Sequence, residues 1–102
     1  MKILTLIAFA DVKQALADSL RELKQVRGFT FTHVEGHGAQ DAHDPALSAR
    51  DFVVGYVPHV RVDILLQEKD VDGVLDALRN SQCGLAGRGQ FWVTQAEKHG
   101  QL

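Results

Sequence analysis

Residues 3–9, ILTLIAF, decide the fold class of this chain. The segment is apolar at both parities, whereas a strand with one face in water alternates apolar and polar residues. It is far shorter than the roughly 20 apolar residues that a membrane-spanning helix needs. We therefore expect a strand with both faces covered, and no direct insertion into a membrane.

Two segments show the apolar period of helices. In the first, residues 12–26, Asp11 and Gln14 form a capping-box pattern and Gly28 marks the expected end. In the second, Asp70 is the expected cap and Gly84 the expected end. The apolar positions of the two stripes are Val12, Ala15, Leu16, Leu20, Leu23 and Val26, and then Val71, Val74, Leu75 and Leu78.

Three further segments are rich in β-branched and aromatic residues: 29–35, 52–66 with an interruption expected at Pro58, and 91–93. The predicted order is β-α-β, a long loop at residues 37–51, and β-α-β, within a single domain over residues 1–102. This order is typical of an α+β, ferredoxin-like βαββαβ fold with two helices on one face of an antiparallel sheet. Because two helices cannot cover two sheet faces, we expect a partner chain in a closed symmetric oligomer.

Composition restricts the class of protein further. The chain has 102 residues, 45% of them hydrophobic, and a formal net charge of −2. This length suits one compact domain, and the lack of a basic excess argues against a nucleic-acid-binding protein. Cys83 is the single cysteine, so no intrachain disulfide is expected, and no signal-peptide pattern is present. These features predict a cytoplasmic protein.

Two glycine segments raise the question of anion binding. Residues 34–40, VEGHGAQ, and 84–93, GLAGRGQFWV, each set glycines two residues apart beside a predicted strand. Glycine permits both positive φ and close approach to a ligand, so such segments can cradle a phosphate. A lone G-x-G is more often simply a turn, and from these residues alone both interpretations stay open.

Imidazole and carboxylate groups follow the first glycine segment. His37, Asp41 and His43 lie close together in sequence, and His59 is a further ligand candidate from across a subunit boundary. Ligands of this kind suit Zn²⁺, Cu²⁺ or Ni²⁺ better than Mg²⁺. The alternative is a solvated polar loop, because a metal site requires convergent geometry.

The residues offer no case for an enzyme. His59 and Asp63 lie on one side of a predicted strand, but at 3.3 Å per residue they are about 13 Å apart, too far for a direct acid–base pair. Ser48 has no base that the sequence identifies. We therefore expect no catalytic site.

The glycine segments also resemble motifs of the PII signal-transduction family. The family signature VKGFGRQKGH matches residues 34–43 at Gly36, Gly38, Gln40 and His43. Residues 56–63, YVPHVRVD, look like the family's FLPKVKIE, and residues 84–93 resemble its phosphate-binding segment, GKIGDGKIFV. The resemblance covers residues 1 to about 93 and implies a ferredoxin-like homotrimer that senses adenine nucleotides.

Carried over to this chain, the resemblance implies a nucleotide site between subunits. The residues that it assigns to this site are Gly36, Gly38, Gln40, Asp63, Gly87, Arg88, Gly89 and Gln90. It also implies that residues 37–51 change order when a ligand binds, so that the loop docks on or releases a membrane transporter.

The chain departs from the family pattern at several functional positions. Gln90 stands where the family has a phosphate-binding lysine, and His59 where classical members have the lysine that binds 2-oxoglutarate. The nucleotidylated tyrosine of the loop falls at Leu47, and residues 95–102 lack the RxR segment that closes classical nucleotide sites. The chain is thus similar to a short PII-like group that often accompanies heavy-metal efflux pumps, which implies a regulatory, non-enzymatic role in metal homeostasis. The alternative is a CutA-like metal-binding trimer in metal tolerance.

Overall fold

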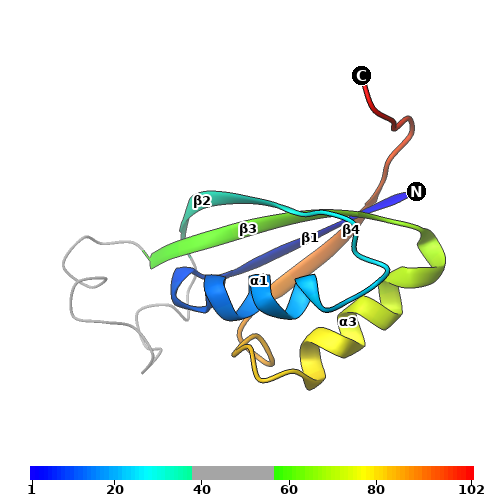
Figure 1. Cartoon of the computed structure of the whole chain (residues 1–102). Coiled ribbons are helices and arrows are strands. Elements are labelled where there is room, and N and C mark those ends of the chain that lie inside the picture. The colour runs from blue at the N-terminus through cyan, green and yellow to red at the C-terminus, as the bar shows by residue number, and fades with distance from the viewer. Residues whose placement is uncertain (38–56) are drawn as a thin grey trace.

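The computed structural model describes residues 1–37 and 57–102, and its strands and helices follow the predicted order (Figure 1). The strands are β1 (Lys2–Phe9), β2 (Thr30–Gly36), β3 (Val57–Leu66) and β4 (Gln90–Gln95). The helices are α1 (Lys13–Arg21) and α3 (Val71–Asn80), which follow the short 3-10 helices η1 (Ala10–Val12) and η3 (Glu68–Asp70). The α+β, ferredoxin-like βαββαβ fold is confirmed.

The sheet is antiparallel, with strand order β2-β3-β1-β4. β1 is central: Thr5 lies opposite Asp63 of β3 on one side and opposite Trp92 of β4 on the other. At the end of β1, Phe9 lies opposite His59 of β3. Because directly opposed residues project from the same side of a sheet, all five side chains lie on one face.

Both helices cover the other face of the sheet (Figure 1). β1 contributes Leu4 and Leu6 to the core beneath the helices, and β3 contributes Val62 and Ile64, all at most 2% exposed. The helices add Leu16, Leu20, Val71, Val74, Leu75 and Leu78. The predicted apolar stripe of the second helix is therefore confirmed. Burial of each such side chain stabilises the fold by about 1.5–3 kcal/mol relative to exposure.

The face without helices is here called the open face. Its central row comes from β1 and consists of Ile3, Thr5, Ile7 and Phe9. Thr5 is only 1% exposed and Phe9 only 8%, because side chains of the neighbouring strands cover them. Trp92 and Leu65, in contrast, are each 41% exposed. The second chain that we expect over this face stays a prediction.

The first helix is shorter than predicted and lacks the predicted capping box. Asp11 lies within η1, which leads directly into α1, and the N-cap position of α1 makes no side-chain hydrogen bond. Gln14 instead donates to Asp18 Oδ1 at 3.0 Å, one helical turn further on. The helix ends at Arg21 rather than near Gly28, because the chain continues in turns whose apolar residues still pack against the core.

Boundaries in the second half also differ from the prediction. Asp70 occupies the N-cap position of α3 but makes no side-chain cap hydrogen bond, and the helix ends at Asn80. Gly84 has φ +84°, so it turns the chain several residues after the helix instead of capping it. Pro58 does not interrupt β3, because it is the second residue of that strand, where a missing ladder N–H is tolerated.

Residues 38–56 lie outside the described residues. They include residues 52–56 of the predicted strand and all of the predicted loop except His37. The candidate site residues among them are Gly38, Gln40, Asp41 and His43. Over residues 1–37 and 57–102, no helix is long and apolar enough to cross a membrane.

Candidate functional site

The described part of the candidate site lies at the end of the sheet that flanks the predicted long loop, here called the loop end. Gly36, the last residue of β2, pairs with Val57, the first residue of β3 (Figure 1). Phe9 at the end of β1 and Arg88 in the turn before β4 contact one another at this end. The ends of β1, β2 and β3 and the turn before β4 therefore meet at the loop end.

His59 is the buried histidine of the loop end. It is 9% exposed, and its Nδ1 lies 2.8 Å from the carbonyl oxygen of Val57. A carbonyl oxygen only accepts hydrogen bonds, so Nδ1 carries a proton and donates, which leaves Nε2 as an acceptor or metal ligand in the neutral ring. Backbone hydrogen bonds of this kind orient the imidazoles of many metal sites. The geometry is thus compatible with the ligand role predicted for His59.

Gly36 makes room for that ring. A Cβ built on Gly36 would overlap Nδ1 and Cε1 of His59. Backbone strain is not the reason for glycine here, since Gly36 is not among the residues with positive φ. The structure therefore gives Gly36 a packing role that the sequence did not reveal, in addition to the ligand role predicted for it.

Phe9 joins the two glycine segments. Its ring lies 4.9 Å from the ring of His59, with an interplanar angle of 40°. The guanidinium carbon of Arg88 lies 4.6 Å from the centre of the same Phe9 ring, within the range of a cation–π contact. Gly36 of the first glycine segment lies against His59, and Phe9 contacts both His59 and Arg88 of the second segment. Phe9 therefore connects the two segments. Sequence reasoning missed Phe9 because an apolar residue at the end of a strand carries no signal of a site.

The second glycine segment forms a tight turn. Gly87 has φ +74°, a conformation that favours glycine. Arg88 and Gly89 both donate their backbone N–H groups to the carbonyl oxygen of Leu85, at 3.0 and 3.1 Å. Two N–H groups that a phosphate cradle would use are therefore already bonded. Binding of an anion here would depend on the side chains of Arg88 and Gln90, both exposed.

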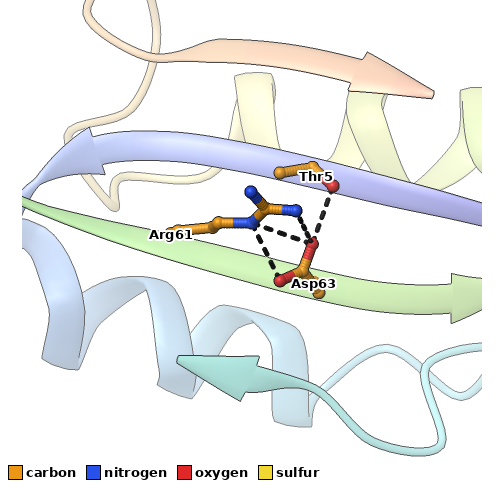
Figure 2. A network of polar contacts seen from close by, with 3 residues as sticks. All are labelled: Thr5, Arg61 and Asp63. Atoms are coloured by element: carbon orange, nitrogen blue, oxygen red, sulfur yellow. Dashed lines mark hydrogen bonds and ion pairs between the residues drawn. The ribbon is translucent and has the colours of Figure 1, made fainter. Parts of the chain in front are cut away.

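Asp63, the remaining nucleotide candidate, lies on the open face away from the loop end. Figure 2 shows its carboxylate between Thr5 and Arg61. Thr5 Oγ1 donates to Oδ1 at 2.8 Å, while Arg61 donates from Nε to Oδ2 at 3.0 Å and from Nη2 to Oδ1 at 3.2 Å. This network satisfies the hydroxyl of Thr5 within a mostly apolar row. Along β3, Asp63 is about 13 Å from His59.

A cavity of about 380 Å³ adjoins Asp63 towards the end of the sheet opposite the loop end. The residues that line it include four polar or charged ones: Thr30, Asp63, Lys98 and His99. Ile3, which also lines the cavity, lies six residues from Phe9 along β1, a separation of about 20 Å. The sequence carries no signal for Lys98 and His99, because they belong to a polar tail without periodicity.

The metal candidates are only partly brought together. His37 is exposed, and its Nε2 lies 3.1 Å from Glu35 Oε2, whereas His59 is buried against Phe9. Within the part of the chain that the structure describes, no group of three or more histidine, cysteine or acidic residues could hold a metal ion. A metal site at these residues would need Asp41 and His43, which are not described, or a second subunit.

Comparison with known proteins identifies similar sequences over most of the chain. The model of a family described as "Protein of unknown function (DUF3240)" matches residues 1–102. Nitrogen regulatory protein P-II of Rhizobium meliloti (strain 1021) is 30% identical over 93 residues, which cover 87% of this chain and 83% of that protein. Nitrogen regulatory protein P-II 1 of Escherichia coli (strain K12) is 31% identical over 84 residues, covering 81% of this chain and 70% of that protein. The predicted relationship to PII proteins is therefore confirmed.

A solved structure also resembles the chain. The crystal structure of a DUF3240 family protein from Shewanella baltica OS155 matches with a TM-score of 0.76, over 99% of this chain and 94% of that chain. At 22% sequence identity, this similarity shows the fold alone. The link to heavy-metal efflux pumps stays a prediction.

Proposed function

Because the chain belongs to the DUF3240 family and is a distant relative of nitrogen regulatory protein P-II, we propose that it is a PII-like regulatory protein. In this proposal it forms a homotrimer and binds a small anionic ligand, such as an adenine nucleotide, between subunits. Binding changes the order of residues 37–51 and so controls a membrane transporter, such as a heavy-metal efflux pump. The protein itself catalyses no reaction.

The contact between the two glycine segments carries this proposal. Gly36, next to the loop, and Arg88, in the turn before β4, are connected through His59 and Phe9. A ligand bound by Arg88 would act on Phe9 and His59 through these contacts, and so on the base of the loop. A sensor needs such a connection, because a ligand shifts a conformational equilibrium only when its contacts differ between the states.

The chemistry of the loop end favours an oxyanion. The guanidinium of Arg88 forms no hydrogen bond or ion pair with any other described residue. Its planar N–H groups match a phosphate or carboxylate in two parallel hydrogen bonds. Gln90 offers an amide donor without the charge of the family's lysine. We therefore expect phosphate binding that is weaker than in classical PII proteins and more dependent on Arg88.

A site between subunits accounts for the position of Asp63. Within one chain, Asp63 lies about 13 Å from His59 at the loop end, too far for one phosphate group to contact both. A second copy packed head to tail against the open face would bring its cavity to the loop end of the first. Exposed Leu65 and Trp92 support such a contact, since large apolar groups on a free surface favour association. A ring of three copies satisfies every such interface.

Metal binding is the second candidate function, and it is favoured by His59, whose Nδ1 is bonded to the Val57 carbonyl oxygen and whose Nε2 is bonded to none of the described residues. In a CutA-like trimer, His59 of one subunit would join His37, Asp41 and His43 of another. Imidazole ligands select borderline-soft cations, whereas phosphate needs N–H donors and positive charge. The two candidates therefore depend on different residues.

Calorimetric titration of the intact chain separates them. The ligands are ATP, ADP, AMP and cyclic nucleotides in one series, and Zn²⁺, Cu²⁺ and Ni²⁺ in another. Saturable binding of a nucleotide supports the regulatory proposal, binding of metals alone supports the CutA-like alternative, and no binding in either series contradicts both. The variant His37→Ala/His43→Ala should lose metal binding and keep nucleotide binding, because Arg88 and the glycine segments remain.

A further inference from the structure

We propose that Phe9 is the positioning residue for Arg88, holding the guanidinium in place while leaving its N–H groups open to a ligand oxyanion. This inference rests on the proposed function, because it assigns one residue its part in the proposed ligand site. It concerns a residue that neither the glycine motifs nor the relatives' names point to.

Four arginines among the described residues lie over aromatic rings, and Arg88 differs from the other three. It is the nearest to its ring, at 4.6 Å from Phe9. It is also the one of the four that pairs with no carboxylate of the described residues. Each of the other three has both a ring and an acidic partner: Arg21 over Phe29 with Asp18, Arg61 over Trp92 with Asp63, and Arg79 over Phe91 with Asp76.

Stacking and hydrogen bonding use different parts of a guanidinium group. An aromatic ring attracts the cation through the negative potential of its own face. The five N–H donors point outward in the plane of the guanidinium. In Arg61, Asp63 occupies the donors of Nε and Nη2 (Figure 2). Phe9 attracts Arg88 without occupying them, so they stay available to a phosphate or carboxylate.

The Phe9 ring is itself held in place. It is 8% exposed and packs against His59, whose Nδ1 is bonded to the Val57 carbonyl oxygen. Gly36 leaves the space that the His59 ring occupies. A fixed ring restricts the rotamers of the exposed Arg88 side chain before the ligand arrives, which reduces the entropy lost on binding.

The test compares the affinity of the intact chain for ATP and for inorganic pyrophosphate in three variants. Phe9→Leu keeps an apolar side chain but removes the aromatic face, and both dissociation constants should rise about three- to tenfold. Phe9→Tyr keeps the ring and should bind both probes as the unmodified chain does. The matched control is Phe91→Leu, which removes the ring beneath Arg79, a side chain already paired with Asp76. It should not change either affinity.

A second measurement reports the stacking without any ligand. The side-chain protons of Arg88 should show an upfield ring-current shift in the NMR spectrum of the unmodified chain and of Phe9→Tyr. Phe9→Leu should abolish this shift, while Phe91→Leu should leave it in place. A chain without the shift at Arg88 overturns the inference even if no probe binds.

The outcomes distinguish this inference from the proposed function. If Arg88→Gln weakens binding and Phe9→Leu does not, the positioning role is wrong and the oxyanion site stands. If the unmodified chain binds neither probe nor any nucleotide, the proposed function fails and the inference fails with it. Weaker binding in Phe9→Leu, together with loss of the Arg88 shift, supports the inference.

Discussion

The ring of His59 fills the space that a side chain at position 36 would need, so β2 and β3 meet beside the long loop through a glycine and an imidazole. The residue directly opposite His59 is Val34, not Gly36. The hydrogen bond from Nδ1 to the Val57 carbonyl oxygen directs the ring towards Gly36, which pairs with Val57. The identity of residue 36 is thus linked to the conformation of His59.

We predict that Gly36→Ala lowers the free energy of unfolding by about 1–3 kcal/mol, because the new Cβ must displace a packed ring. Chemical denaturation monitored by circular dichroism measures the loss. The double variant Gly36→Ala/His59→Ala should lose less unfolding free energy than the two single variants lose in sum. The reason is that His59→Ala removes the ring that the new Cβ would otherwise displace. If the free-energy losses of the two single variants add up to that of the double variant, the His59 ring is not what excludes a side chain at position 36.

Gly87 allows a test of backbone strain alone. It has φ +74°, and a Cβ at this position would meet no atom within 4 Å. We therefore predict that Gly87→Ala destabilises the fold by about 1–2 kcal/mol through the left-handed conformation. Gly28→Ala is the control, since its Cβ would also meet nothing and its φ is not positive. It should be neutral or slightly stabilising, and equal melting temperatures of the two variants would refute the strain argument.

Local patterns were sufficient for most of the fold. The stripe from Val71 to Leu78 identified the buried face of α3. The capping box at Asp11 was wrong because a 3-10 turn leads straight into α1, so the backbone never presents the cap geometry. A residue type shows that a cap is chemically available, whereas the preceding backbone decides whether it forms.

The candidate site was less predictable, because its contacts are tertiary. The glycines of the second segment were recognisable in the sequence. The sequence did not reveal that the backbone N–H groups of Arg88 and Gly89 donate to the Leu85 carbonyl oxygen and are therefore already bonded. Phe9 meets His59 and Arg88 only after all the strands have assembled. No spacing in the sequence encodes such a contact.

The open face gives a prediction about assembly. Light scattering at micromolar concentration should give about three times the 11.2 kDa mass of the chain. Leu65→Lys should reduce this mass, because Leu65 is 41% exposed on the open face and a charge there would be buried in the trimer. Ala15, wrongly predicted to belong to the apolar stripe, is exposed on α1, so Ala15→Lys is the control and should leave the trimer intact. A monomeric unmodified chain would rule out the covered open face.

The central claim is that the ligand binds between subunits, with Arg88 from one and Asp63 from its neighbour, and subunit complementation tests it most directly. Trimers of Arg88→Gln alone, or of Asp63→Asn alone, should bind ATP at least about tenfold more weakly, since the first lacks the cation for the phosphates at every site and the second lacks the carboxylate acceptor for ligand O–H or N–H groups. Unfolding the two variants together and refolding them in equal amounts should restore roughly a quarter of the sites, those that combine the intact Arg88 of one chain with the intact Asp63 of another. Arg88→Gln mixed with the double variant Arg88→Gln/Asp63→Asn is the control and should restore none. Mixed trimers that form but recover no ATP binding would contradict a site shared between subunits.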